Sequence, residues 1–277
     1  MTLLEKYLGE KKMRGEKILS LYLTAGFPTL AATLQLFETM ADAGADLFEL
    51  GMPFSDPLAD GPVLQNASRI ALRNGITISG AFEMLHELNR RCNIPTLLMG
   101  YANPFLQFGW EKLLDGLEQA GASGLIVPDL PPEESAPLSD LLSQRGLDQI
   151  HLASPNTPRE RLQKIEALGG AFIYAVSVTG VTGTREKLPQ ETQLFLRRLR
   201  TTTRRLILVG FGISNAETVR SLAPYCDGVT VGSALIQCID KSPDLKTARE
   251  NIRLLTKQLK CSLTEDNHEC RKLAQES

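Results

Sequence analysis

The chain has 277 residues, of which 43% are hydrophobic, 22% charged and 6% aromatic. Its 30 Lys and Arg residues against 32 Asp and Glu give a formal net charge of −2, so it lacks a general positive field for a nucleic-acid backbone. The apolar fraction is that of a globular protein, and no run approaches the roughly 18 apolar residues that a membrane span needs. The length fits two ordinary domains or one barrel of about 250 residues.

The first residues and the cysteines indicate a compartment. Residues 1–12 alternate apolar and charged side chains, unlike a secretory signal, which predicts a cytoplasmic location. The cysteines are odd in number and form no CxxC pair, which favours reduced thiols over a disulfide framework; they are Cys92, Cys226, Cys238, Cys261 and Cys270.

Short apolar, β-branched runs bounded by Gly, Pro, Asp or Asn predict eight strands. In chain order they are residues 18–24, 46–50, 95–99, 124–127, 149–153, 171–177, 205–209 and 228–231. Helical spacing of apolar residues predicts helices between them, at 30–41, 78–91, 110–120, 133–145, 158–168, 190–200 and 215–222. A spacing near 30 residues per strand–helix unit implies parallel strands with right-handed crossovers.

Eight such units with no break in composition favour a single α/β domain, a closed (β/α)8 TIM barrel, over two doubly wound domains. We expect the barrel to span residues 1–261, with an extra N-terminal helix at 2–12 over its bottom and a short extra helix at 234–239 after strand eight. Beyond Leu254 the pattern turns polar, and residues 262–277 are expected to form a frayed tail.

Two charge-rich runs, 10–17 and 197–205, raise the alternative of a local nucleic-acid patch. Because neither is interleaved with aromatic residues, solvated faces fit them better.

In such barrels the functional residues lie at the carboxyl ends of the strands. Glu49 lies there between Phe48 and Leu50, at the end of the second strand. Burial would raise its pKa, so that it could give and take protons near neutral pH. The alternative is a structural Glu paired with an Arg.

Asp60 follows on a loop that contains three prolines. Two carboxyls on one strand and its loop can act as acid and base if their environments differ. Asp56 and Asp60 could equally cap the loop, as Asp often does beside Pro and Gly.

Glycines cluster after the last three strands, at Gly180 and Gly183, at Gly210 and Gly212, and at Gly232 before Ser233. Glycines let a backbone approach an anion, and helix N-termini present free N–H groups to it. This pattern predicts a phosphomonoester ligand. The segment 178–189 between the sixth strand and the next helix reads either as a mobile lid over that ligand or as an ordinary surface loop.

No Lys lies at a strand end, so a Schiff-base mechanism has no candidate residue. The three histidines are scattered, which disfavours a metal site, and His151 reads as a core histidine. We therefore expect carboxyls and hydroxyls to carry the chemistry without a metal or cofactor in this chain.

The run from Phe48 through Pro62, FELGMPFSDPLADGP, closely resembles the signature of the tryptophan synthase α subunit family. The resemblance covers about residues 2–257. It continues through the segments 43–46, 101–104, 127–131, 133–135, 180–183, 210–214 and 232–234.

The resemblance implies cleavage of indole-3-glycerol phosphate to indole and glyceraldehyde 3-phosphate, a retro-aldol step late in tryptophan biosynthesis. The residue matching Glu49 would be the principal acid–base, and that matching Asp60 would accept the indole N–H bond. A proton on indole C3 makes the ring an electron sink, so neither a Schiff base nor a metal is required.

Carried over by position, the resemblance assigns further roles. Tyr174 would lie beside Glu49 and the substrate, and Thr182 in the lid would bond Asp60 on closure. The phosphate would be held by Gly183, Gly212, Gly232 and Ser233, and the indole pocket would be walled by Tyr22, Met99, Leu152, Phe211 and Thr230.

The resemblance also implies a partner. Asp56, Pro57 and Asn103 would face a β subunit in an α2β2 complex. That subunit would use pyridoxal phosphate to join indole, received through a tunnel, to serine. Two alternatives stay open: a stand-alone lyase that makes free indole, and a weakly catalytic activator of a β subunit.

Two positions depart from the family pattern. Val178 and Thr179 follow Ser177 where many members have an Arg before the lid glycines, which bears on how the lid is anchored. Tyr22 stands where Phe is common and would add a hydroxyl near the pocket.

Overall fold

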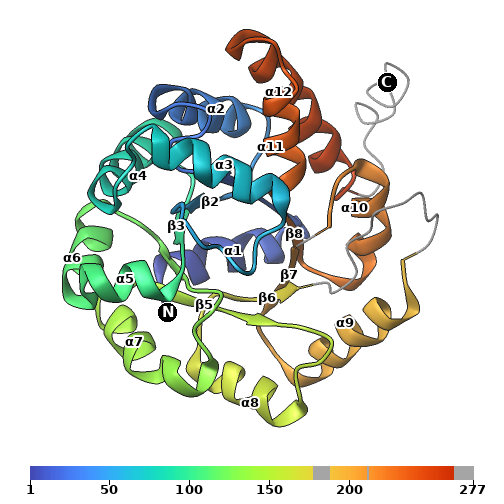
Figure 1. The fold of residues 1–277 in the computed structure, drawn as a ribbon. Helices are drawn as coiled ribbons and strands as arrows, with labels where there is room; N and C mark the ends of the chain where they lie inside the picture. The colour runs from blue at the N-terminus through green and yellow to red at the C-terminus, as the bar shows by residue number, and fades with distance from the viewer. Residues whose placement is uncertain (177–187, 211, 265–277) are drawn as a thin grey trace.

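The computed structural model describes residues 1–176, 188–210 and 212–264. Eight parallel strands close into a barrel in chain order, and β8 pairs back with β1 (Figure 1). They are β1 (Ile18–Thr24), β2 (Leu47–Gly51), β3 (Thr96–Met99), β4 (Gly124–Ile126), β5 (Asp148–Ala153), β6 (Phe172–Val176), β7 (Leu206–Gly210) and β8 (Gly228–Val231). The predicted (β/α)8 barrel is confirmed.

Helices surround the barrel (Figure 1). They are α1 (Leu3–Met13), α2 (Leu30–Asp42), α3 (Pro62–Arg73), α4 (Ile78–Cys92), α5 (Ala102–Phe108), α6 (Trp110–Gln119), α7 (Pro132–Gln144), α8 (Arg159–Leu168), α9 (Gln190–Thr202), α10 (Ala216–Leu222), the 3-10 turn Ala223–Tyr225, α11 (Ser233–Asp240) and α12 (Leu245–Cys261). In the described ranges, none of these helices combines the length and apolar character needed to cross a membrane.

Three helices differ from the sequence prediction. Neither α3 nor α5 was predicted; α3 follows the proline-containing loop of Asp60, and Pro62 occupies its first turn, where its missing N–H costs nothing. α12 continues beyond Leu254, where a polar stretch was expected, because Ile252, Thr256 and Leu259 keep one face buried at helical spacing.

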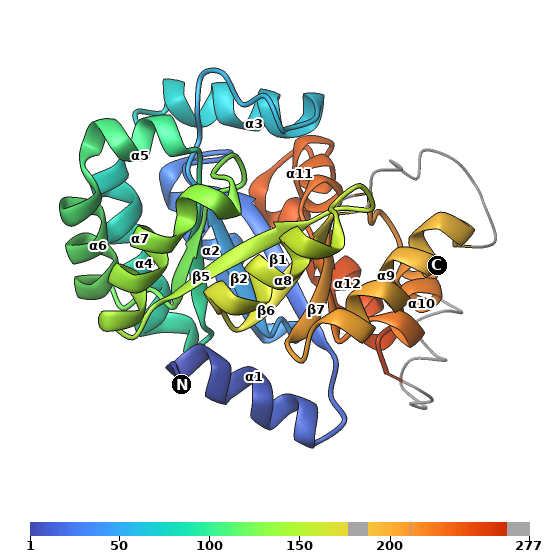
Figure 2. The ribbon, with the colours of Figure 1, turned by 90° about the horizontal axis from the view of Figure 1, so that it is seen from below.

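Alternation along the strands divides the core into two clusters. On β1, Leu19, Leu21 and Leu23 face outward and pack under the helices. Inward-facing residues form a second cluster inside the barrel, which includes Leu4 and Leu8 of α1. The expected plug is confirmed: α1 lies across one end of the barrel and α3 at the opposite end (Figure 2).

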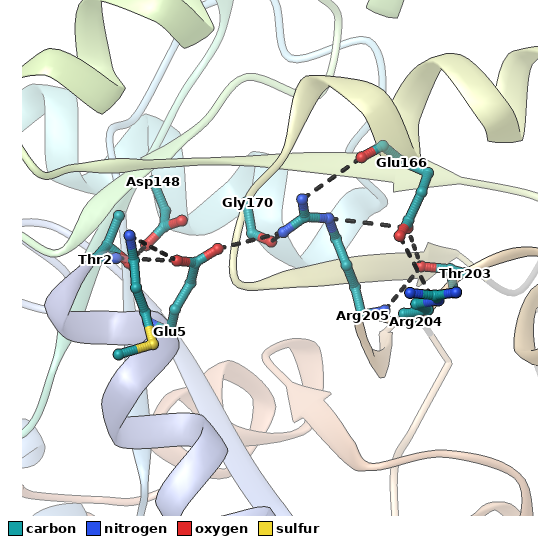
Figure 3. Close-up of polar contacts among 9 residues, drawn as sticks. Thr2, Glu5, Asp148, Glu166, Gly170, Thr203, Arg204 and Arg205 are labelled. Atoms are coloured by element: carbon teal, nitrogen blue, oxygen red, sulfur yellow. Dashed lines mark hydrogen bonds and ion pairs between the residues drawn. The ribbon is translucent and has the colours of Figure 1, made fainter.

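Polar contacts attach α1 to the barrel (Figure 3). The Thr2 hydroxyl accepts from the Glu5 N–H, Glu5 reaches back to the Thr2 N–H, and together they form a capping box that starts the helix. Thr2 also donates to the carboxylate of Asp148 on β5. Glu5 lies 3.3 Å from Arg205, which donates in turn to the carbonyl of Gly170. The start of the chain is therefore joined to strands far away in the sequence.

The two charge-rich runs take part in similar ion pairs. Lys11 lies 2.7 Å from Asp46 at the start of β2, and Arg200 lies 2.5 Å from Asp227 before β8. Lys11 is largely shielded from solvent, so the expectation of a solvated face is wrong there, whereas Arg200 is exposed beside its carboxylate partner, as expected.

Among the described cysteines, Cys92, Cys226 and Cys238 carry free thiols, whereas Cys261 at the end of α12 is disulfide-bonded. The expectation of reduced thiols is therefore wrong for Cys261. The number and spacing of cysteines do not show which of them the fold brings together.

Candidate active site

A cavity of about 220 Å³ opens at the carboxyl ends of the strands. It is lined by eight of the predicted site residues: Tyr22, Asp60, Met99, Tyr174, Gly212, Thr230, Gly232 and Ser233. Five further lining residues, Leu64, Ile213, Ser214, Ala234 and Gln237, were not predicted.

Glu49 lies on β2 with its side chain fully buried. Its Oε1 accepts hydrogen bonds from the Ser20 hydroxyl at 2.7 Å and from the Thr230 hydroxyl at 3.0 Å. Burial raises the pKa of Glu49 to about 7, although both hydroxyl bonds oppose the rise. Within the part of the chain that the structure describes, no Arg or Lys pairs with this carboxyl, so the alternative of a structural ion pair is wrong there.

Asp60 lies on the loop between β2 and α3. Burial raises its pKa to about 6, and a hydrogen bond from Tyr101 partly opposes this. The Tyr101 hydroxyl also accepts the Ala59 N–H at 3.1 Å, which ties the loop to the end of β3. The N-cap of α3 is Gly61, with no side-chain bond, so Asp60 does not cap that helix.

Two tyrosines show that the carboxyls converge. Burial raises the pKa of Tyr22, and the nearby charges of Asp60 and Glu49 raise it further. Burial likewise raises the pKa of Tyr174, with Glu49 and Asp60 both contributing, while a hydrogen bond with Thr230 acts in the opposite direction. Both carboxyls therefore act on the same pair of rings at the floor of the cavity.

Strand-end glycines make room for these rings. A Cβ at Gly51 would overlap the hydroxyl of Tyr22, and a Cβ at Gly210 would overlap the ring of Tyr174. These two glycines thus serve side-chain packing inside the site, a use that their position in the sequence did not indicate.

The opposite wall of the cavity suits an anion. α11 begins at Ser233 after Gly232 and has no side-chain cap, so its first N–H groups remain available to a ligand. Gly212 adopts a φ of 74°, which favours glycine, and it lines the same wall. The predicted short helix after strand eight is present at this wall.

The remaining predicted residues lie elsewhere. Gly183, Thr182 and Phe211 fall outside the described residues, as do the departing positions Val178 and Thr179. Leu152 lines a neighbouring cavity of about 310 Å³ rather than the one beside Asp60.

His151 lies on β5 and lines that second cavity as well. It is buried, its Nε2 lies 3.5 Å from the Ser139 hydroxyl, and burial lowers its pKa to about 4. The interpretation of His151 as a neutral core histidine is confirmed. Within the described ranges, no three His, Cys, Asp or Glu side chains are grouped as metal ligands would be.

The three predicted partner-facing residues differ in exposure. Asp56 and Asn103 are exposed, whereas Pro57 is buried within the chain. Two leucines beside them were not predicted as surface residues: Leu58 is 95% exposed and Leu106 on α5 is 56% exposed.

Fold and cavity together define a (β/α)8-barrel enzyme with a strand-end cavity that Asp60 and the start of α11 line, and with the buried carboxyl of Glu49 bonded to Thr230 of that lining. Comparison with known proteins gives the particular family. A family model described as tryptophan synthase alpha chain matches residues 8–266. The chain belongs to the tryptophan synthase alpha chain family, a family of lyases, which confirms the resemblance seen in the sequence.

Individual relatives agree over most of their length. The tryptophan synthase alpha chain of Roseiflexus sp. is 47% identical over 230 residues, which cover 83% of this chain and 88% of the relative. That of Carboxydothermus hydrogenoformans is 43% identical over 240 residues, covering 87% and 90%. The crystal structure of tryptophan synthase subunit alpha from Legionella pneumophila superposes with a TM-score of 0.87 at 33% identity, covering 95% of this chain and 98% of that one.

Proposed function

We propose that this chain cleaves indole-3-glycerol phosphate to indole and glyceraldehyde 3-phosphate. The observation that carries the proposal is Glu49, a fully buried carboxyl with a pKa of about 7 whose hydrogen-bond partners are hydroxyls rather than cations. Such a group can exchange a proton with a substrate near neutral pH. Membership of the tryptophan synthase alpha chain family supports the substrate.

In the proposed reaction, protonated Glu49 gives its proton to indole C3. The bond between C3 and the glycerol chain then breaks, and its electron pair returns to the indole ring. The hydroxyl on the adjacent glycerol carbon loses its proton to Glu49 and becomes the aldehyde of glyceraldehyde 3-phosphate. The proton count closes because the acid consumed in the first half is regenerated in the second. General acid–base assistance of this kind is worth roughly 10²–10⁴ in rate.

Asp60 stabilises the charge that builds up in the ring. Protonation at C3 places positive charge on the indole nitrogen, and the Asp60 carboxylate accepts its N–H. Asp60 must be ionised for this role, and its pKa of about 6 allows that at neutral pH. Removing one such group that stabilises a transition-state charge typically costs about 2.7–4 kcal/mol. In this scheme Tyr174 packs beside the reacting carbons and Tyr22, Met99, Leu152, Phe211 and Thr230 form the indole pocket.

The phosphate would bind at the wall formed by Gly212, Gly232 and Ser233, together with Gly183 from the proposed lid. Backbone N–H groups and the start of α11 hold an anion there without Lys or Arg. Thr182 would bond Asp60 when the lid closes.

The proposal includes a partner, a β subunit in an α2β2 assembly that receives the indole. The exposed residues Asp56, Leu58, Asn103 and Leu106 support a surface at the open end of the barrel, because exposed leucines there would be covered by a partner. Pro57 is buried and would act by shaping the loop rather than by contact. In this scheme the pyridoxal phosphate chemistry is carried out by the partner and not by this chain.

The test is to measure cleavage of indole-3-glycerol phosphate by the full chain, with and without a purified tryptophan synthase β subunit. We expect weak cleavage alone and strong stimulation by the partner. High activity that the partner leaves unchanged would instead identify a stand-alone lyase. Cleavage in neither condition, with the β subunit still activated, would identify a non-catalytic activator and overturn the proposal.

A further inference from the structure

The two oxygens of the Glu49 carboxyl have different surroundings. Oε1 accepts both hydroxyl bonds, from Ser20 and from Thr230. Oε2 is buried and has no hydrogen-bond partner among the described residues. A buried oxygen without a partner carries a free-energy cost, so its position calls for an explanation from function.

The two donors come from neighbouring strands at one level of the barrel. Ser20 on β1 and Thr230 on β8 are register partners, whereas Glu49 pairs with Tyr22, the next inward-facing residue of β1. Ser20 thus lies one inward position nearer the closed end than Tyr22. Both hydroxyls are buried, Ser20 completely. Glu49 does not line the cavity itself, but Thr230, to which it is bonded, does. The two hydroxyls therefore fix Oε1 and leave Oε2 as the oxygen without a bonded partner among the described residues.

Ser20 differs from Thr230 in the number of side chains that its hydroxyl group contacts by hydrogen bonds. Thr230 lines the cavity and is also hydrogen-bonded to Tyr174, so it serves two groups. The Ser20 hydroxyl makes one side-chain hydrogen bond in the described part of the chain, to Glu49, and it does not line the cavity. A buried hydroxyl with this single partner has its effect through Glu49.

We propose that Ser20 is a positioning residue for the acid–base cycle: with Thr230 it fixes Oε1, so that Oε2 carries the proton to and from the substrate. This inference rests on the proposed lyase function. The bond also favours the charged carboxylate, since a hydroxyl donor stabilises the ionised acceptor more than the neutral one. Ser20 thereby offsets part of the effect of burial and keeps the carboxyl able to release its proton at neutral pH.

The test compares Ser20→Ala with Ser20→Thr, which keeps the hydroxyl, and with Ser135→Ala as a matched control. Ser135 is equally buried, but its hydroxyl donates to the Pro131 carbonyl at the start of α7, away from the cavity. Cleavage of indole-3-glycerol phosphate is followed from pH 5 to 9, with the β subunit present. Thermal unfolding and β-subunit binding show whether each variant is folded.

For Ser20→Ala we expect the Glu49 pKa seen in the pH profile of kcat/KM to rise by about one, the effect of losing one hydrogen bond to a charged group. We expect kcat to fall while KM changes little. Ser20→Thr should restore the profile, and Ser135→Ala should match the wild type. An infrared titration of the Glu49 carboxyl, taken in the wild type and in Ser20→Ala as the difference from the same protein carrying Glu49→Gln, should show the same rise in Ser20→Ala without any turnover.

Two results would overturn the inference. One is an unchanged pH profile and an unchanged infrared titration in Ser20→Ala. The other is an equal change in Ser20→Ala and Ser20→Thr, which would show that packing rather than the hydrogen bond matters. If the wild type itself does not cleave the substrate, the proposed function fails instead, and the infrared titration still reports whether Ser20 holds Glu49.

Discussion

At the closed end of the barrel, Glu5 lies 3.3 Å from the guanidinium of Arg205 (Figure 3). Asp46 lies 2.7 Å from the ammonium group of Lys11. At the open end, Glu49 is fully buried and Asp60 half-buried, and both are bonded to hydroxyl groups instead. Burial raises the pKa of Glu49 to about 7 and that of Asp60 to about 6, because their bonded hydroxyl groups oppose the rise only in part, and both protonation states are then within reach near neutral pH. The carboxyls of Glu5 and Asp46 thus form ion pairs within the chain at the closed end, whereas Glu49 and Asp60 at the open end are placed for proton transfer and charge stabilisation in the proposed reaction.

Asp148 shows that a raised pKa alone does not mark a catalytic group. It lies at the closed end, bonded to Thr2, and burial raises its pKa to about 6, the same value as for Asp60. It lines none of the cavities described above, and α1 covers it. Asp60 differs from Asp148 by its position on a loop that lines the cavity at the carboxyl ends of the strands.

The largest expected effect is that of Glu49→Gln. The amide cannot exchange a proton with the substrate, so cleavage should fall by roughly 10²–10⁴ while the fold and partner binding persist. The measurement is steady-state cleavage with the β subunit present. Asp148→Asn is the matched control, a buried carboxyl of raised pKa at the other end, and should keep full activity. Retained turnover in Glu49→Gln would remove the basis for its role.

Asp60→Asn should have the next largest effect. It removes the negative charge that stabilises the protonated ring, and we expect kcat to drop by about 10²–10³. Affinity for glycerol phosphate should hardly change, because the anion wall does not include Asp60. Inhibition by glycerol phosphate and turnover are measured on the same variant. Collapse of phosphate binding with surviving turnover would contradict the assignment.

Glu49 should also impose a pH dependence on stability. Its pKa rises from 4.5 to about 7 on folding, so the stability linked to its protonated form is full below pH 4.5 and is lost as pH rises through 7. A pKa difference of about 2.5, at about 1.36 kcal/mol per pKa unit, corresponds to about 3 kcal/mol in the free energy of unfolding. In denaturant unfolding, the free energy of unfolding of Glu49→Gln relative to that of the wild type should therefore increase by about that amount between pH 4.5 and 8. A constant difference across this range would mean that Glu49 is not held protonated.

The smallest effect is expected from Arg205→Met at the closed end. The variant removes the guanidinium beside Glu5 and Glu166 and the bond to Gly170, which should lower the free energy of unfolding by about 1–3 kcal/mol. The partly exposed site and screening by water favour the lower part of that range. The pH profile of cleavage should stay that of the wild type. A shifted profile would show that the two ends of the barrel are coupled.

Most of the architecture could be predicted because each strand is an apolar run bounded by turn residues, and each unit repeats near 30 residues. The helices α3 and α5 were not predicted; each carries a proline near its start, Pro62 and Pro104, a position that a helix tolerates. The disulfide at Cys261 was missed because pairing depends on tertiary proximity.

Within the site, the sequence pointed to Glu49, Asp60 and the glycines, since these residue types are unusual at buried strand ends. It did not point to Ser20 or Tyr101. Ser20 lies two residues before Tyr22. Because alternate residues of a strand point to the same face, the sequence already placed Ser20 on the same side of β1 as the predicted pocket residue Tyr22. Tyr101 reaches Asp60 only because β2 and β3 are neighbours, a fact of topology rather than of local sequence.

Gly51 with Tyr22 and Gly210 with Tyr174 form two tightly fitted pairs at the floor of the cavity. Each ring occupies the space that a side chain on the neighbouring strand would need. A methyl group at position 51 or 210 would therefore overlap the ring of Tyr22 or Tyr174 unless that ring is replaced by a smaller side chain. Each glycine and the tyrosine opposite it therefore constrain each other. Mutant libraries meant to change which ligands this cavity accepts should vary positions 22 and 51, or 174 and 210, together.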